Sequence, residues 1–356
     1  MTQLINSSES AEKGTAEKGA SSASAAASFG VAFIGSGSAQ LEVALSNARL
    51  AQVVDTSDEW IATRTGIRQR HIASASDSIR SLGAAAARKA IAQANLTPTD
   101  IDLIILATST PDDLFGSACQ IQAELGATRA IAFDITAACS GFVFSLITAA
   151  QFIRTGAYQN VVVVGADILS RLTDWSDRRT CVLFGDGAGA IVMQRSSTEN
   201  LLSFEMHSDG SMNDCLNAAY APTAKPLVED ITTQAGHFNP VTMNGREVYR
   251  FAVNRVPEVL EKSLFHAGLS TDDIDWLILH QANQRILDAA AKRLGIDAAK
   301  VVSNMAKHGN TDAASIPIAL DEWVRAGKIK SGDTLALSGF GAGLSWGAAI
   351  LKWGHY

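Results

Sequence analysis

One pattern occurs twice in the chain: ANLTPTDIDLIIL at residues 94–106 returns as AGLSTDDIDWLIL at residues 267–279. In each copy a helical pattern comes before the segment and an apolar, strand-like run ends it. A second pair follows in the same order, with FGDGAG at residues 184–189 and GFGAG at residues 339–343, each between two apolar runs. Two repeated motifs that occur in the same order predict an α/β protein made of two similar halves that pack against each other.

The composition excludes several classes of protein. Hydrophobic residues make up 47% of the 356 residues and charged residues 18%, so we expect a large core. The net charge of −7 gives no reason to expect a nucleic-acid partner, and no run is long and apolar enough to predict a membrane span. The four cysteines lack metal-ligand spacing, which predicts free thiols, no metal site and a reducing compartment, the cytoplasm.

The chain divides into three predicted parts. Residues 1–28 are mainly Ser, Ala, Glu, Lys and Gly, which predicts a disordered N-terminal tail. Residues 29–205 are the predicted N-terminal half, which contains the candidate nucleophile described next. Residues 206–356 are the predicted C-terminal half.

Cys139 lies between a predicted strand and a predicted helix. The apolar run at residues 131–135 is typical of a buried strand, and residues 141–156 are typical of a buried helix that ends at a glycine. The positive field at a helix N-terminus favours the thiolate, and small neighbours leave room for a substrate. The alternative is an inert core cysteine; we expect a nucleophile.

His280 directly follows the second copy of the repeat, where the first copy has Ala107. It therefore ends a buried strand, at the position where α/β folds place ligands and catalytic groups. A helix is predicted from Gln284 to Leu294. A structural histidine is the alternative, but the position favours a catalytic one.

The run HGNTDAAS at residues 308–315 predicts a tight turn followed by a helix, with Thr311 or Asp312 as its N-cap. Asn310 would project from this turn and offer an amide donor. The 341–342 turn would add backbone N–H groups. Together with the imidazole of His280 and the thiol of Cys139, these groups predict a thiol-acyl site with two sets of oxyanion donors.

At these residues the chain resembles β-ketoacyl-acyl-carrier-protein synthase III, of the thiolase-like superfamily. The matching motifs are TAACSG at 136–141, HQAN at 280–283, GNT at 309–311, GFGAG at 339–343, DTSDEW at 55–60 and TRTGIR at 63–68. Their order and spacing are kept from about Phe33 to Trp353. The resemblance implies a thiolase-like five-layered α-β-α-β-α core, built from the two pseudo-repeated halves, and a homodimer.

The resemblance also implies the initiating condensation of type II fatty acid synthesis. An acyl group, expected to be acetyl, would pass from acyl-CoA to Cys139. Malonyl-acyl-carrier-protein would then lose carbon dioxide, and its enolate, held by His280 and Asn310, would attack the acyl-cysteine to give a 3-oxoacyl-acyl-carrier-protein. The backbone N–H groups of Cys139, Gly341 and Ala342 would hold the tetrahedral oxygen. The CoA thioester is a substrate, and no cofactor or metal is expected.

Binding residues follow from the same resemblance. The implied CoA contacts are Trp60, Arg64 and Arg178, and the implied docking residues for the acidic carrier protein are Arg250, Arg285 and Lys292. Arg285 and Lys292 lie seven residues apart on a predicted helix and hence on one face.

The sequence departs from the family at Asp312, where serine is frequent, and at the position of a phenylalanine that reaches the acyl pocket across the dimer. Counting back from Cys119 without gaps places Leu114 at that position, with Phe115 beside it. The length of the acyl chain that the pocket accepts therefore does not follow from the sequence.

The sequence is compatible with three alternatives to different degrees. A secondary-metabolite synthase of the same fold would use other donors. A non-catalytic acyl-CoA or carrier-binding module would not need an intact Cys139, His280 and Asn310. A dehydrogenase based on Gly35-Ser36-Gly37 lacks the third glycine of its fingerprint.

Overall fold

The computed structural model describes residues 28–39 and 41–354, so the predicted tail lies outside the described residues except for Ser28. The N-terminal half contains a five-stranded sheet in the order β1-β7-β6-β4-β5. Its strands are β1 (Gly30–Ser38), β4 (Leu103–Ala107), β5 (Ile131–Ile135), β6 (Asn160–Ile168) and β7 (Asp186–Ser196). Its helices are α3 (Ile79–Gln93), α4 (Ala118–Leu125) and α5 (Gly141–Arg154), with short 3-10 helices η1 (Pro98–Asp100), η2 (Ala138–Ser140) and η3 (Leu169–Leu172).

The C-terminal half repeats this plan with a four-stranded sheet in the order β13-β14-β15-β8. Its strands are β8 (Leu201–Ser208), β13 (Trp276–Leu279), β14 (Thr334–Gly341) and β15 (Ser345–Lys352). Its helices are α6 (Gly245–Ala267), α7 (Gln284–Leu294), α8 (Met305–His308) and α9 (Ser315–Arg325), with η5 (Thr271–Asp273), η6 (Ala298–Lys300) and η7 (Asp312–Ala314). An isolated parallel bridge from Leu277 to Val301 takes the place that β5 has in the first half.

The two copies of the sequence repeat adopt the same local structure. In each, a 3-10 turn leads into the strand, and a capping box closes that turn, from Thr97 to Asp100 in η1 and from Ser270 to Asp273 in η5. The capping carboxylate accepts backbone and hydroxyl hydrogens, which stabilises the turn. The repeat therefore begins the equivalent strands β4 and β13, as the sequence predicted.

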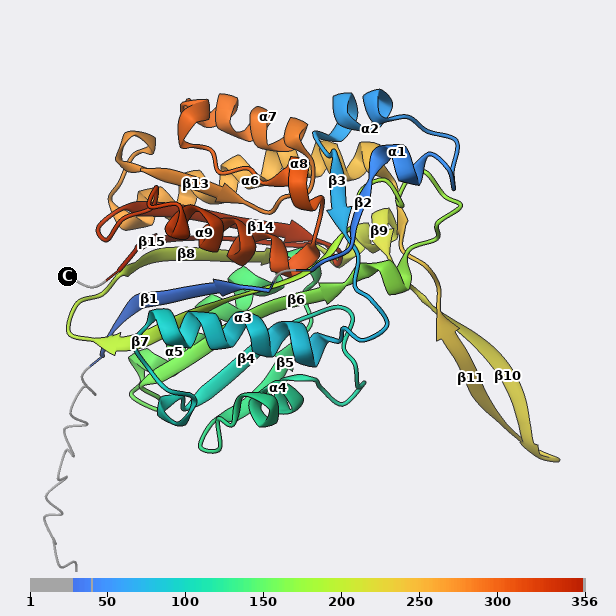
Figure 1. Cartoon of the computed structure of the whole chain (residues 1–356), viewed down its shortest axis with the longest axis horizontal. Helices are drawn as coiled ribbons and strands as arrows, with labels where there is room; N and C mark the ends of the chain where they lie inside the picture. The colour runs from blue at the N-terminus through green and yellow to red at the C-terminus, as the bar shows by residue number, and fades with distance from the viewer. Residues whose placement is uncertain (1–27, 40, 355–356) are drawn as a thin grey trace, which may run out of the picture.

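The halves stack in five layers (Figure 1). Helices α3 and α4 cover one face of the first sheet, α5 and α9 fill the space between the two sheets, and α6 and α7 cover the second sheet. The strands show why: Val161 and Val163 of β6 pack in the central layer, whereas Val162 and Val164 pack under α3. Alternate side chains of a strand point to opposite faces, and apolar residues at both positions require helices on both sides.

The structure corrects two expectations. The boundary drawn between residues 205 and 206 cuts β8, which pairs with β15 and belongs to the second sheet, so the halves separate between Ser196 and Leu201. The strand at 131–135 was expected to be buried, but β5 is the sheet edge and Ile131 is 54% exposed. An apolar run therefore identified a strand but not its place in the sheet.

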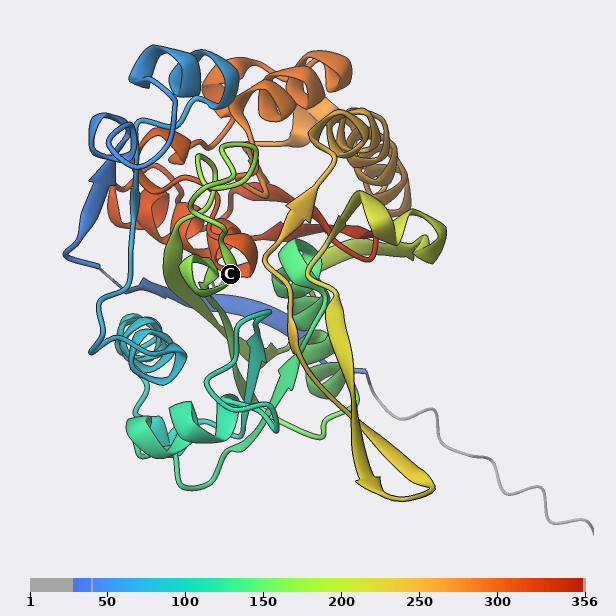
Figure 2. The ribbon, with the colours of Figure 1, turned by 90° about the vertical axis from the view of Figure 1, so that its right-hand side faces the viewer.

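Smaller elements surround one end of the two sheets. These are β2 (Ala44–Ser46), α1 (Asn47–Leu50), α2 (Asp58–Thr65), β3 (Gln69–His71), η4 (Gly210–Cys215), β9 (Leu216–Asn217) and β12 (Thr242–Met243). A long hairpin of β10 (Tyr220–Val228) and β11 (Ile231–Phe238) projects from the body, with almost all of its residues exposed (Figures 1 and 2).

Candidate active site

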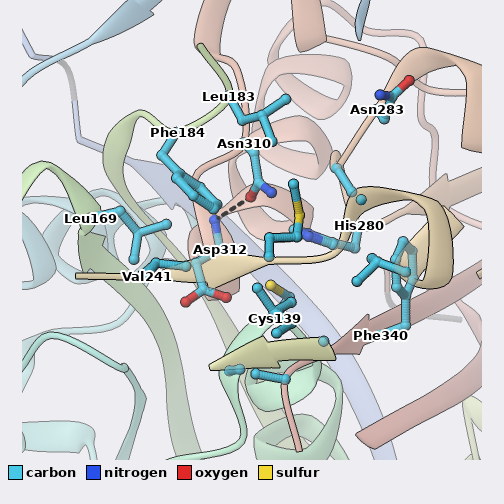
Figure 3. Close-up of a pocket in the computed structure, with 18 of the residues that line it drawn as sticks. Cys139, Leu169, Leu183, Phe184, Val241, His280, Asn283, Asn310, Asp312 and Phe340 are labelled. Carbon is cyan, nitrogen blue, oxygen red and sulfur yellow. Dashed lines mark hydrogen bonds between the residues drawn. The ribbon is translucent and has the colours of Figure 1, made fainter. Parts of the chain in front are cut away.

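A cavity of about 670 Å³ lies where the two halves meet, and it brings together the three predicted catalytic side chains. Cys139 comes from η2, His280 follows β13, and Asn310 precedes η7 (Figure 3). The predicted residues that line the same cavity are Trp60, Arg64, Arg178, Arg285, Gly341 and Ala342. Arg250 and Lys292 are not part of its wall. Residues far apart in the sequence thus converge because both halves present the same end of their sheets.

Cys139 is held in a tight turn directly before α5. Ala138 has φ of +44°, a left-handed conformation that non-glycine residues rarely adopt and that costs free energy. Gly341 lies against the cysteine: a Cβ at Gly341 would stand 2.9 Å from Cys139 Cβ and 3.2 Å from its Sγ. Glycine is therefore required at 341, and the end of β14 fixes the thiol at the cavity wall.

Burial and nearby carboxyl groups act against the Cys139 thiolate, opposite to the backbone N–H groups that were expected to favour it. The pKa of Cys139 is raised well above its ordinary value because the thiol is buried and the carboxyl groups of Asp312 and Asp167 lie near it. Burial and like charge both disfavour a thiolate. The sequence pattern predicted Cys139 as the nucleophile but did not predict the carboxyl groups that oppose its ionisation.

His280 is buried and neutral. Burial lowers its pKa to about 3, so the imidazole carries no charge near pH 7. Its Nδ1 lies 2.7 Å from Ser315 Oγ, which also accepts the N–H of Gln281 at 3.4 Å. We assign the Ser315 hydroxyl hydrogen to Nδ1 and the ring hydrogen to Nε2. In this tautomer His280 offers an N–H donor to the cavity, and Ser315, which the sequence reasoning missed, is the hydrogen-bond partner of its other ring nitrogen.

Asn310 is held by its backbone and by its side-chain oxygen. Its N–H donates to Leu183 O at 2.9 Å, and its carbonyl accepts from Gly185 N at 2.9 Å. Its Oδ1 accepts the backbone N–H of Asp312 at 3.0 Å, which turns the amide nitrogen toward His280 (Figure 3). The amide therefore presents its N–H donors to the same space as the imidazole.

Neither Asp312 nor Thr311 caps the following helix with its side chain, contrary to the sequence expectation. The N-cap of α9 is Ala314, which has no side chain for that role, and Thr311 makes no capping hydrogen bond. The carboxyl group of Asp312 is 4% exposed and points toward Cys139 (Figure 3). Asp167, at the end of β6, is fully buried beneath it. Sequence reasoning missed Asp167, although a carboxylate at the end of an apolar strand was a usable signal.

The predicted CoA residues lie together at the cavity. The guanidinium of Arg64 is 4.5 Å and that of Arg178 is 5.3 Å from the centre of the Trp60 ring. Arg178 also donates to the backbone oxygen of Asp55 at 3.0 Å. A flat cation close to an indole ring is a favourable arrangement, and Arg178 already occupies a place next to the ring.

The predicted docking residues are exposed on two neighbouring helices. Arg285 and Lys292 lie on α7, and the Arg285 guanidinium is 5.6 Å from the centre of the Tyr249 ring at the cavity wall. Arg250, on α6, forms an ion pair with Glu247. Arg285 therefore borders the cavity, whereas Arg250 and Lys292 lie on the same two helices outside its wall.

Comparisons with known proteins identify the family of the chain. A family profile described as "3-Oxoacyl-[acyl-carrier-protein (ACP)] synthase III C terminal" matches residues 264–353, and the profile "3-Oxoacyl-[acyl-carrier-protein (ACP)] synthase III" matches residues 133–210. The β-ketoacyl-[acyl-carrier-protein] synthase III of Acaryochloris marina is 65% identical over 91% of this chain and 98% of its own length. The chain belongs to the β-ketoacyl-acyl-carrier-protein synthase III family.

Solved structures of the family share its fold. The 3-oxoacyl-[acyl-carrier-protein] synthase III of Aquifex aeolicus is 44% identical, with a TM-score of 0.84 over 91% of this chain and 100% of that one. A priming β-ketosynthase of the R1128 polyketide pathway has the same TM-score at 34% identity, over 92% of this chain and 97% of that one. The predicted thiolase-like fold and the prediction of an acyltransferase that initiates fatty acid synthesis are therefore confirmed.

The described residues contain no helix that is long and apolar enough to cross a membrane.

Proposed function

We propose that this synthase carries out its reaction in two half-reactions at Cys139. In the first, the sulfur attacks the thioester carbon of a short acyl-CoA, expected to be acetyl-CoA; the new S–C bond forms and CoA leaves with a proton. In the second, malonyl-acyl-carrier-protein loses carbon dioxide and its enolate attacks the acyl-cysteine. The cysteine sulfur leaves as a thiolate, and the product is a 3-oxoacyl-acyl-carrier-protein. The observation that supports this most is the convergence of one thiol and two neutral N–H donors in one buried cavity.

Neutral donors suit the second half-reaction. Loss of carbon dioxide moves negative charge onto the thioester oxygen, and a fixed N–H donor stabilises that charge most where water is excluded. His280 Nε2–H and the Asn310 amide meet this requirement, since both are buried and neither carries a charge of its own. The backbone N–H of Cys139 and the 341–342 turn are proposed as donors for the tetrahedral oxygen of the first half-reaction.

The CoA adenine is proposed to lie between Trp60 and Arg178. Because the Arg178 guanidinium stands 5.3 Å from the indole centre, it must move aside for a ring to enter. The exposed cations Arg250, Arg285 and Lys292 are proposed to receive the acidic carrier protein, whose phosphopantetheine arm would then reach the cavity that Arg285 borders.

A homodimer is also part of the proposal. β5 pairs only with β4 among the described strands, which leaves one backbone edge free, and a free strand edge is a template for pairing with a strand of another chain. Ser117 and Ala118 donate to Asp134 of β5 at 2.8 and 2.7 Å, which ties the preceding loop to that edge. In that loop Leu114 and Phe115 are 81% and 98% exposed. We propose that a second copy pairs with β5 and covers them. All four cysteines are free, which supports the cytoplasm as the compartment.

The two half-reactions can be measured separately. Cys139→Ala is expected to abolish transfer of radiolabelled acetyl from acetyl-CoA to the protein. Asn310→Ala is expected to slow malonyl-acyl-carrier-protein decarboxylation by roughly a hundredfold to a thousandfold and to leave acyl transfer nearly intact. Asn213→Ala, at an exposed asparagine outside the cavity, is the matched control. Labelling that persists in Cys139→Ala would contradict the assignment of the nucleophile.

A further inference from the structure

Arg70, on β3, carries a buried charge close to the turn that holds Asn310. Its side chain is 0% exposed, and burial lowers its pKa only to about 10, so the guanidinium stays charged at neutral pH. Its Nε has no partner within the described residues. Its hydrogen bonds there go to uncharged oxygens, those of Leu45, Asn47 and Val182. Burying a charge without a counter-charge costs free energy, which indicates a role beyond stability.

The guanidinium holds the segment of backbone that pairs with Asn310. Arg70 Nη2 donates to the carbonyl oxygen of Val182 at 2.6 Å. The next carbonyl along the chain, that of Leu183, accepts the backbone N–H of Asn310 at 2.9 Å, and Gly185 N donates to Asn310 O at 2.9 Å. Leu183 accordingly lies beside Asn310 at the cavity (Figure 3). The bond from Arg70 therefore fixes the segment that holds the asparagine backbone.

The stem of Arg70 packs against two glycines of the same turn. A Cβ at Gly185 would stand 2.9 Å from Arg70 Cβ, and a Cβ at Gly309 would stand 3.4 Å from it. Gly309 has φ of +66°, a conformation that glycine adopts without strain. The backbone that flanks Asn310, in sequence and across the pairing, thus lies directly against Arg70. A displacement of Arg70 would therefore displace the Asn310 amide.

The other nitrogen of the guanidinium faces the helix α2. Arg70 Nη1 donates to Asn47 Oδ1 at 2.8 Å, and Asn47 Nδ2 donates to Asp58 Oδ1 at 2.9 Å. Asp58 is the first residue of α2, the helix that carries two of the proposed CoA residues. A continuous series of hydrogen bonds therefore runs from the helix of the CoA site, through Arg70, to the backbone of Asn310.

We propose that Arg70 is a positioning residue that places the Asn310 amide for decarboxylation and links that placement to the CoA-binding helix α2. A guanidinium suits this role because its planar fork bonds two groups in a fixed geometry, whereas lysine offers a point charge on a flexible stem. Misplacing a reacting group by about 1 Å costs up to about a hundredfold in rate. The assignment rests on the role of Asn310 in the proposed function.

Two variants of the full chain test the assignment. Arg70→Met keeps an apolar stem and removes every donor, and Arg70→Lys keeps the charge but not the fork. Both are expected to lower the kcat of malonyl-acyl-carrier-protein decarboxylation, by about tenfold to a hundredfold in Arg70→Met. The KM for acetyl-CoA should rise, because α2 loses its attachment, while the rate of Cys139 acetylation at saturating acetyl-CoA changes much less.

Arg154→Met is the matched control. The guanidinium of Arg154 also donates to a backbone carbonyl, Leu201 O at 2.9 Å, but Arg154 does not line the cavity. This variant loses a bond of the same kind at a distant place, and we expect it to decarboxylate malonyl-acyl-carrier-protein as the wild type does.

A double-mutant cycle separates positioning from general destabilisation. If Arg70 acts through Asn310, Arg70→Met slows decarboxylation in the wild-type background and has little further effect in Asn310→Ala, where the amide is absent. The same is expected for Arg70→Lys, so the cycle remains available if the methionine variant does not fold. An equal loss in both backgrounds, or full decarboxylation activity in a folded Arg70 variant, overturns the assignment.

A second readout does not depend on the proposed function. It is the side-chain amide signal of Asn310 in NMR spectra of protein with isotope-labelled asparagine, assigned by its loss in Asn310→Ala. We expect the signal to move in Arg70→Lys and to stay in place in Arg154→Lys. If Asn310→Ala decarboxylates like the wild type but the signal moves as expected, the proposed function fails and the placement of Asn310 by Arg70 stands. A signal that does not move in Arg70→Lys overturns the assignment.

Discussion

Glu322 provides a quantitative test of how the loop before Asn310 is held. From α9, its carboxylate accepts from Lys307 Nζ at 2.7 Å, His308 Nε2 at 2.8 Å and Asn304 Nδ2 at 3.0 Å. Burial raises the pKa of Glu322, but these hydrogen bonds and the charge of His308 outweigh it and lower the pKa from 4.5 to about 2. The carboxylate therefore fastens α8 and the following turn to α9.

A shift of this size corresponds to about 3.4 kcal/mol of stability if all of it is realised. The Glu322 side chain is 24% exposed, so solvent screening reduces the effect, and we expect Glu322→Gln to lose about 2 kcal/mol at pH 7. For a chain of 356 residues, that loss corresponds to a melting temperature lower by about 3 °C.

The pH dependence has a defined sign. The pKa is lower in the folded state, so the stabilisation is fully present above the ordinary value of 4.5 and is lost as the pH falls toward 2. Calorimetry at pH 7, 5 and 3 should show the difference between wild type and variant shrinking to less than half at pH 3. Glu261→Gln, at an exposed glutamate of α6 with no ion pair within the described residues, is the control. Equal melting temperatures at pH 7, or a difference that persists at pH 3, would refute the reasoning.

Three further outcomes are expected. Arg285→Glu combined with Lys292→Glu should raise the KM for malonyl-acyl-carrier-protein and leave acyl-CoA use nearly intact, and added salt should weaken the wild type in the same direction; equal loss of both half-reactions would contradict a docking role. CoA binding should displace Arg178 from the indole and change the fluorescence of Trp60 relative to a Trp60→Phe control, and an unchanged difference spectrum would argue against the adenine site. Ile131→Asp, at a residue of the β5 edge that is 54% exposed, should convert a dimer into a monomer in sedimentation velocity, whereas a wild type that sediments as a monomer would refute the dimer.

The sequence was sufficient for the architecture because the fold repeats. The paired segments at 94–106 and 267–279 begin equivalent strands, and β5 and α7 have the bounds that the patterns predicted. Local rules explain this success: apolar periodicity, glycine stops and capping residues act over a few neighbours. The same rules could not place β5 at the sheet edge, since a strand's neighbours are chosen by the tertiary fold.

The candidate site was predictable only where a motif carried the chemistry. Cys139, His280 and Asn310 each lie at the end of a recognisable pattern, and the cavity brings them together. The electrostatics were not predictable, because Asp167 approaches Asp312 from a strand about 145 residues earlier in the sequence. The two carboxyl groups come together only when the two halves pack against each other, so no local sequence pattern predicts the pair.

The central layer has a consequence for how the enzyme loses activity. The short turns η2 and η7 occupy equivalent positions at the starts of α5 and α9, and each contains a left-handed residue, Ala138 in one and Asp312 in the other. Cys139 belongs to one half of the chain, and His280, Asn310 and Asp312 belong to the other. A small slide of one half over the other would part them without breaking a single strand. The turnover rate therefore depends strongly on the contact between the halves. Mild denaturant should abolish activity at a lower concentration than the one that changes the far-UV circular dichroism signal.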